Sequence, residues 1–211
     1  SQYTGRYKSI YILGLRVAAC GAIYDNFDRA NNVFSGDVSN ALRDSQHYIA
    51  CDYGTVNPCV FLDCASTEDG VVYVLREYRW DSRVRMAQKT DAAYVQDMIK
   101  FAGAPESCDA IIIVDPSAVS FINALRAEGF FVKPANNDVL NGIMKVSSLI
   151  GQKRLKIHES CTGLIAEMEG YSWDERSVNS GVEKPLKIRD HAPDALRYYV
   201  NTCLSSFDIT R

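Results

Sequence analysis

Two stretches of the sequence share one design, an apolar run that ends on a single aspartate. One run covers Tyr48–Asp52 and the other covers Ala110–Asp115. Short apolar runs bounded by turn residues are typical of buried strands. An unpaired carboxylate is costly to bury. Each aspartate is therefore expected either to cap the turn after its strand or to emerge at the strand end and hold a cation.

A third aspartate lies in the segment Asp190-His191-Ala192-Pro193-Asp194-Ala195-Leu196. Pro193 favours the first turn of a helix. His191 precedes Asp194 by three residues, so both side chains are expected on the same helix face. The sequence thus offers two strand-end acids and one helix-borne acid with a histidine beside it.

Three carboxylates gathered on rigid elements are ligands that Mg²⁺ or Mn²⁺ prefers. The candidate metal ligands are Asp52, Asp115 and Asp194, with His191 as a fourth. Two such ions about 3.5–4 Å apart can activate a water and stabilise the leaving oxygen of a phosphodiester. The chemistry that this set predicts is metal-dependent phosphodiester hydrolysis, provided that the fold brings the residues together.

The elements between these acids must position them. Three consecutive runs read as strands joined by short loops, which indicates an antiparallel meander: 48–54, 59–62 and 71–75. A helix is predicted to begin after its cap at Thr90 and to end at Gly103. The run that leads to Asp115 is wholly apolar, as in a parallel strand with helices on both faces.

The remaining elements alternate. We expect a helix that ends at Gly129, then a strand, a helix, a strand and a short helix, at 130–132, 139–150, 155–157 and 161–168. Residues 171–189 are expected to form a hairpin or excursion before the last helix. This order predicts an α/β fold with a ribonuclease H-like mixed sheet flanked by helices. In that topology Asp52 and Asp115 lie at neighbouring strand ends, and the last helix brings Asp194 against them.

Size and composition bound the possibilities. A chain of 211 residues with 47% hydrophobic and 23% charged residues fits one large globular domain or one domain with an appendage. We assign residues 1–46 to an N-terminal connecting arm that packs on the domain, and residues 47–211 to the domain itself. The net charge of −3 is not that of a strong autonomous nucleic-acid binder. This net charge does not exclude a nuclease, because the clustered acids that a metal site needs themselves contribute negative charge.

Several classes are disfavoured by missing patterns. The seven cysteines include no CxxC pair and no Cys/His pair at zinc spacing, so we expect a reduced, cytosolic protein without disulfides or zinc. No apolar run of about 18 residues is present, so no membrane span is expected. No G-x-x-x-x-G-K-[ST] loop occurs, so no ATPase motor is expected.

These residues resemble the nuclease domain of the large terminase subunit of tailed bacteriophages. The resemblance lies in Asp52-Tyr53-Gly54, Ile113-Val114-Asp115 and the 190–196 segment. The stretch Tyr11–Tyr24 is also similar to the segment that leads out of that family's ATPase domain. The resemblance implies a metal-dependent endonuclease that cleaves concatemeric double-stranded phage DNA during genome packaging, using two Mg²⁺ or Mn²⁺ ions.

The resemblance also implies metal ligands and partners. The metal aspartates carry over to Asp52, Asp115 and Asp194. Many members have a carboxylate at the position of His191, so Asp190 either substitutes for it or caps the helix. The implied partners are the ATPase domain of the same polypeptide, the small terminase subunit and the portal protein, in the cytoplasm of the infected bacterium. A start at Ser1 and the missing phosphate loop are expected of an excised C-terminal nuclease domain.

Two basic runs lie near the predicted site in sequence. Solvated faces explain most charge runs, and phosphate contact is the alternative here. The candidate DNA contacts are Arg79, Arg83, Arg85, Lys184, Lys187 and Arg189. Two further interpretations remain open: a nuclease that resolves Holliday junctions, and a non-catalytic docking module whose acids only cap turns. Asp63 is expected to face solvent or a turn, with an accessory acid of the site as the alternative.

Overall fold

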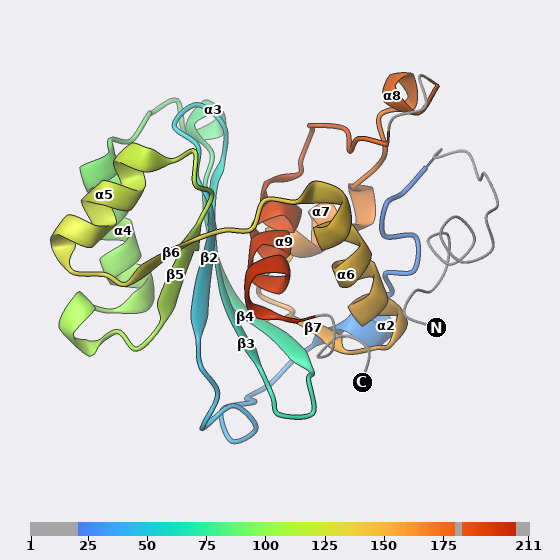
Figure 1. Ribbon diagram of the computed structural model, residues 1–211, viewed down its shortest axis with the longest axis horizontal. Coiled ribbons are helices and arrows are strands. Elements are labelled where there is room, and N and C mark those ends of the chain that lie inside the picture. The colour runs from blue at the N-terminus through green and yellow to red at the C-terminus, as the bar shows by residue number, and fades with distance from the viewer. Residues whose placement is uncertain (1–20, 180–182, 206–211) are drawn as a thin grey trace.

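The computed structural model describes residues 21–179 and 183–205, in which a seven-stranded mixed sheet lies between helices (Figure 1). The strand order is β1-β7-β4-β3-β2-β5-β6. Strands β2, β3 and β4 pair antiparallel, and the other pairs are parallel. The strands are β1 (Val33–Phe34), β2 (Tyr48–Asp52), β3 (Cys59–Ser66), β4 (Val72–Trp80), β5 (Ile111–Val114), β6 (Val132–Pro134) and β7 (Leu155–His158). This is the predicted ribonuclease H-like fold.

The helices cover the sheet in two layers, each with its own hydrophobic core. On one face α4 (Asp91–Ala102) and α5 (Val119–Glu128) pack against Ile49, Cys51 and their neighbours. On the other face α6 (Val139–Gly151), α7 (Thr162–Gly170) and α9 (His191–Cys203) pack against Ala50, Leu62 and Ile113. Successive residues of one strand serve opposite cores because side chains alternate along a strand.

The strand register determines where the acids emerge. Cys51 pairs with Val114 across the parallel β2–β5 ladder, so Asp52 and Asp115 follow side by side at the same sheet edge. Alternation places Asp52 on the same face as Ala50, the face that α9 covers. The prediction of neighbouring strand ends is confirmed.

Helix ends follow local sequence signals. The Thr90 side chain accepts a hydrogen bond from Ala93 N–H at the start of α4, and α5 stops at Gly129, which has φ 110°. A positive φ favours glycine because it has no Cβ. The cap at Thr90 and the ends at Gly103 and Gly129 are as predicted.

Several elements differ from the expectation. Strand β3 runs four residues beyond Leu62, to Ser66. Strand β4 runs five residues beyond Leu75, since its polar second half pairs with β3 as far as Trp80 opposite Cys59. Strand β6 begins at Val132 rather than Phe130, and the Phe131 side chain points outward at 69% exposure. Strand β1 was not predicted, because a two-residue strand carries no periodicity.

The remaining segments are short. They are α2 (Arg29–Asn32), α3 (Ser82–Arg85), a 3₁₀ turn (Pro105–Ser107) and α8 (Glu175–Asn179). Ile23 N–H donates to Tyr171 O, and β1 pairs with β7. Residues 21–46, which are the described part of the predicted arm, therefore pack on the domain. The boundary at residue 47 stays a prediction, and most of the predicted Tyr11–Tyr24 segment lies outside the described residues. No helix in the described ranges has the length and apolar character to cross a bilayer.

Candidate active site

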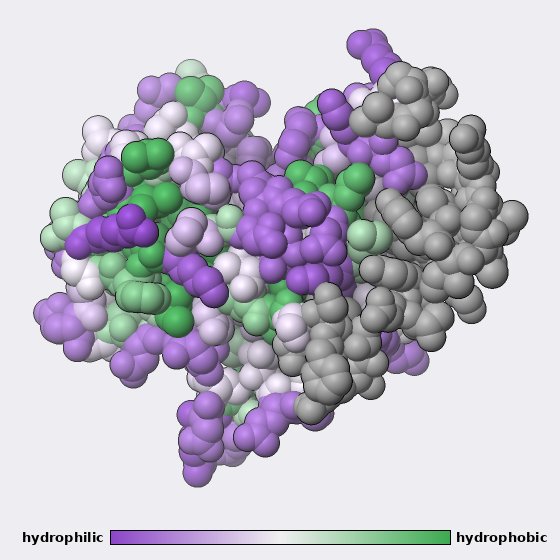
Figure 2. Space-filling model, in the orientation of Figure 1, coloured by the Kyte–Doolittle hydropathy of each residue, from purple (hydrophilic) through white to green (hydrophobic). Residues whose placement is uncertain are grey.

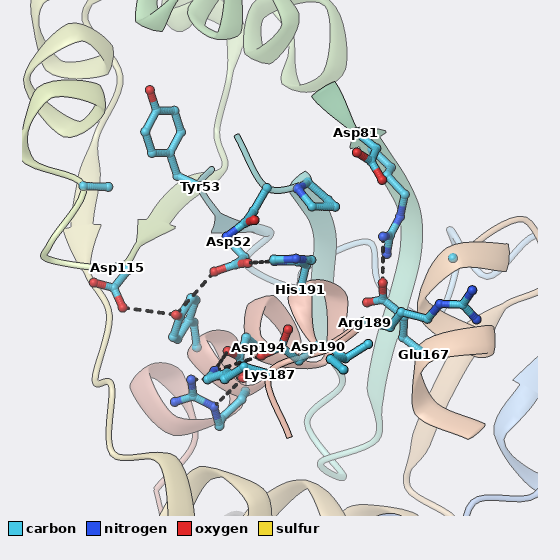
Figure 3. A pocket seen from close by; sticks show the side chains of 18 of the residues that line it. Asp52, Tyr53, Asp81, Asp115, Glu167, Lys187, Arg189, Asp190, His191 and Asp194 are labelled. Carbon is cyan, nitrogen blue, oxygen red and sulfur yellow. Dashed lines mark hydrogen bonds and ion pairs between the residues drawn. The ribbon is translucent and has the colours of Figure 1, made fainter. Parts of the chain in front are cut away.

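One open pocket, of about 910 Å³, lies at the sheet edge where β2 and β5 end. The predicted ligand residues all line it: Asp52, Asp115, Asp190, His191 and Asp194. Figure 3 shows them converging from two strands and one helix. On the molecular surface the top of Figure 2 is notched between the half with α4 and α5 and the half with α6 and α9. The fold thus gathers residues that are up to 142 positions apart, between Asp52 and Asp194.

Asp52 and His191 form the closest cross-element contact in this group. His191 Nδ1 lies 2.8 Å from Asp52 Oδ2. Burial raises the pKa of Asp52, the hydrogen bond from His191 opposes this, and the nearby Asp194 raises it further, so the net shift is upward. Burial lowers the pKa of His191, but the hydrogen bond and charge of Asp52 outweigh it, and the net shift is again upward. The pair therefore holds a proton readily.

Asp115 has a different environment. Ser117 N–H donates to its Oδ1 at 2.8 Å, and the Asn137 amide donates to its Oδ2. Burial alone would raise the pKa of Asp115, but the Ser117 hydrogen bonds, the Tyr198 hydroxyl and the charge of Arg197 lower it overall. Asp115 is thus held as a carboxylate.

Tyr198 links the two strand-end aspartates, although the sequence analysis did not single it out. Its hydroxyl lies 3.1 Å from Asp115 Oδ2 and 3.4 Å from Asp52 Oδ1. A phenol has one proton to donate, so it serves one carboxylate at a time. Tyr198 follows Asp194 by four residues and His191 by seven, and this helical spacing is the signal that could have identified it.

Arg197 lines the pocket and pairs with Asp194. Its guanidinium lies 3.2 Å from Asp194 Oδ1, donates to Asn137 Oδ1 at 3.1 Å and lies over the Tyr198 ring at 4.8 Å. The side chain is only 2% exposed. A Cβ at Gly142 would lie 2.3 Å from Arg197 Cγ, so the arginine needs a glycine in α6. The sequence analysis missed Arg197 because a helical arginine is usually exposed.

Lys187 enters the pocket from the segment before α9. Its Nζ lies 2.9 Å from Asp190 Oδ2 and 2.7 Å from Asp194 Oδ2. Burial lowers the pKa of Lys187, yet the two aspartates raise it overall. Asp190 occupies the N-cap position of α9 but makes no capping hydrogen bond with its side chain. Glu167 Oε2 instead accepts from Ala192 N–H at 2.8 Å.

The predicted basic residues divide into two groups. Arg79, Arg83, Lys187 and Arg189 line the pocket, whereas Arg85 and Lys184 do not. Arg79 lies within β4, 3.0 Å from Glu77 and 2.7 Å from Glu167, so two carboxylates already neutralise its charge. Arg83 donates to Asn57, and Arg189 is exposed. The Arg85 guanidinium lies 5.7 Å from the Trp80 ring centroid.

Asp63 does not face solvent, contrary to the expectation. It is 4% exposed, and its carboxylate lies 2.9 Å from His47 Nδ1 and 2.7 Å from Arg76 Nη2. The reason is that every residue of β3 except the last is buried, so this strand has no solvent-facing side to receive the charge. Asp63 lies away from the acids at the pocket.

The side chains at the pocket have the chemistry to bind a divalent cation, but their arrangement in the described residues is not that of a metal site. Carboxylate oxygens are the ligands that Mg²⁺ takes, and Asp190 and Asp194 already converge on one cationic group, the Lys187 ammonium. No three His, Cys, Asp or Glu side chains within 21–179 and 183–205 are placed to hold a metal ion together. The acids instead have internal partners, namely His191, Tyr198, Lys187 and Arg197.

Similar proteins share this fold. No protein-family model matches the chain. It is 29% identical over 190 residues to the large terminase subunit of Escherichia phage T5, a match that covers 84% of this chain and 41% of that protein. A solved large terminase from a thermophilic bacteriophage is 40% identical with a TM-score of 0.88, and the match covers 97% of this chain and 51% of that one. The chain thus spans about half the length of that solved relative.

A more distant structure shares the fold alone. It is the large terminase nuclease of the thermophilic phage G20c with bound magnesium, which is 13% identical with a TM-score of 0.62. That match covers 84% of this chain and 95% of the other.

Proposed function

We propose that this chain, which resembles the nuclease domain of the large terminase subunit of tailed bacteriophages, is a metal-dependent endonuclease acting on double-stranded DNA. The observation that carries the proposal is the convergence of Asp52 and Asp115 with His191 and Asp194 in one open pocket. The metal bound to the terminase nuclease of phage G20c supports the use of a divalent ion.

In the proposed site Asp52, Asp115, Asp194 and His191 would hold two Mg²⁺ or Mn²⁺ ions, with Asp190 beside them. Such ions, when bound, supply an activated water and stabilise the leaving oxygen of the phosphodiester. The chain's own residues prepare the site. Tyr198 keeps Asp52 and Asp115 adjacent, and Arg197 fixes Asp194. His191, hydrogen-bonded to Asp52, fixes the orientation of that carboxylate.

The substrate contacts follow from the basic residues that remain accessible. Arg83, Lys187 and Arg189 line the pocket and are proposed to contact phosphates of the DNA backbone. Lys184 and Arg85 lie further out, and Arg79 is proposed to hold α7 and β4 together rather than to contact DNA. Phosphate contacts carry no sequence information. We therefore propose cleavage that is nearly independent of sequence.

The proposed biological setting is packaging of concatemeric phage DNA in the cytoplasm of the infected bacterium. The proposed partners are an ATPase domain of the same polypeptide, the small terminase subunit and the portal protein. With a net charge of −3, the domain alone is expected to bind DNA weakly, because non-specific affinity scales with the number of Lys and Arg contacts to phosphate. Partner proteins would then hold the DNA.

The test is cleavage of supercoiled plasmid by the purified chain. Activity should require Mn²⁺ or Mg²⁺, should stop in EDTA, and should disappear in Asp52→Ala, Asp115→Ala and Asp194→Ala while circular dichroism stays unchanged. A four-way DNA junction, run beside linear duplex, separates a junction resolvase from the proposed enzyme. Parental cleavage rates in Asp52→Ala would refute the site assignment.

A further inference from the structure

The pocket contains a cation that belongs to the chain. Lys187 Nζ contacts Asp190 Oδ2 and Asp194 Oδ2 at 2.9 and 2.7 Å. The two carboxylates are 6% and 7% exposed, whereas the Lys187 side chain is 62% exposed. Figure 3 shows the lysine beside both acids, ahead of the helix that carries them. A partly solvated ammonium thus neutralises two nearly buried carboxylates.

The two oxygens of Asp194 have partners of different kinds. Oδ1 faces the Arg197 guanidinium and the Tyr171 hydroxyl, at 3.2 and 3.4 Å, and both of these side chains are buried. Oδ2 pairs with the exposed Lys187. Buried partners cannot leave without repacking the core, while an exposed lysine can rotate into solvent. Oδ2 is therefore the oxygen that a metal can reach, and it is the one that Lys187 occupies.

We infer that Lys187 is an internal competitor for the divalent cation at Asp190 and Asp194, and that metal binding displaces its ammonium into the pocket mouth. This inference rests on the proposed function and adds the residue that sets metal affinity. Without a cation, the two carboxylates would repel each other and the nearby Asp52. Lys187 supplies that positive charge when no metal is bound. The free energy needed to displace its ammonium from the two carboxylates lowers the affinity for metal.

The displacement has a consequence for substrate binding. While Lys187 pairs with both aspartates, two carboxylates already neutralise the charge of its ammonium, so it attracts a DNA phosphate only weakly. Once the metal replaces it, the ammonium is free at the pocket mouth beside the exposed Arg189. Metal occupancy thus releases a positive charge on the side from which a phosphate backbone would approach.

The test measures metal affinity directly, by calorimetric titration of Mn²⁺ into the whole chain without DNA. Lys187→Met removes the competing charge and keeps the length of the side chain. It should bind Mn²⁺ about fivefold more tightly, equivalent to about 1 kcal/mol for one ion pair. Lys187→Arg keeps the charge and should stay close to the wild type. Lys184→Met is the matched control, since Lys184 is an exposed lysine on the same segment outside the pocket lining. Its Mn²⁺ affinity should not change.

The outcomes separate this inference from the proposed function. If the wild type binds Mn²⁺ and Lys187→Met binds it no more tightly, the competitor role is wrong and the nuclease proposal stands. An equal gain in Lys184→Met would show a general charge effect and would also overturn it. If neither the wild type nor Lys187→Met binds Mn²⁺, the proposed metal site itself is wrong.

Discussion

Two histidine–aspartate pairs lie in different parts of this protein, and their contact distances are nearly equal. His191 Nδ1 is 2.8 Å from Asp52 at the end of β2, and His47 Nδ1 is 2.9 Å from Asp63 within β3. The chain neighbours of the two histidines differ. His191 begins α9, whereas His47 precedes β2 in a loop. Their surroundings determine what each pair can do.

The Asp63 carboxylate has an arginine as a second partner, and within the described residues the Asp52 carboxylate does not. Arg76 contacts the second oxygen of Asp63, and although burial raises the pKa of Asp63, His47 and Arg76 lower it overall. Asp52 has no arginine among its described partners and is close to other acids, so its pKa is raised. Perturbed acids that face a cleft are candidates for function. A histidine–aspartate distance alone does not separate a structural pair from a functional one.

The largest expected effect is on catalysis. Asp52→Asn should reduce cleavage to background, since an amide cannot replace the charged carboxylate of the proposed metal ligand. Without metal, the variant should be as stable as the wild type or more so. Plasmid cleavage and thermal melting measure the two properties. A strong loss of stability in Asp52→Asn would mean that Asp52, like Asp63, is a structural acid.

The converse effect is expected at Asp63. Asp63→Asn should lower the free energy of unfolding by about 2 kcal/mol, because a nearly buried acid loses its charged pairing with Arg76 and His47. The value is set below that of a fully buried pair because Arg76 is 54% exposed. Urea unfolding measures it, and cleavage per folded molecule should be unchanged. Loss of cleavage in folded Asp63→Asn would erase the distinction between the two pairs.

Added metal should stabilise the folded protein only when Asp52 is intact. At a concentration ten times the dissociation constant, Mn²⁺ should stabilise the wild type by about 1.4 kcal/mol. The same gain is expected in Asp63→Asn and none in Asp52→Asn, when each is melted with and without Mn²⁺ and compared with an EDTA control. A metal-induced shift retained in Asp52→Asn would place the ion elsewhere.

The smallest effect concerns pH. The hydrogen bond that His47 donates to Asp63 raises the pKa of His47, against the opposing effect of burial. Protonated His47 therefore stabilises the fold fully below its ordinary pKa of about 6.5, and this contribution is lost as pH rises through the raised value. The contribution of Asp63 is present above its ordinary pKa of about 3.9 and is lost as pH falls through its lowered one.

The pair should thus stabilise the fold most between about pH 4 and 6.5. His47→Gln should cost about 0.5 kcal/mol there, since the ring is partly exposed, and less above pH 8. Urea unfolding of both proteins at pH 5.5 and 8.5 tests the sign. A larger cost at the higher pH would contradict it.

The sequence predicted the site's acids more completely than their partners. Asp52 and Asp115 were predictable because an apolar strand that ends on a carboxylate can be recognised from the amino-acid sequence alone. Asp63 was not, because its strand is buried on both faces and its register with β4 shifts at Asp63/Cys64. Arg197 and Lys187 could not be assigned either. Their roles depend on which carboxylate lies within about 3 Å, and spacing along the chain does not contain that distance.

Helix α9 has a consequence for how the protein is made. It carries His191, Asp194, Arg197 and Tyr198, while the strands that it must join were completed by Val114. A nascent chain that has emerged only as far as β7 therefore exposes both strand-end aspartates without their helical partners. Contacts this distant in sequence form late, because closing a long loop precedes them. During synthesis, the candidate site is therefore completed only after α9 has emerged, at the end of the described chain.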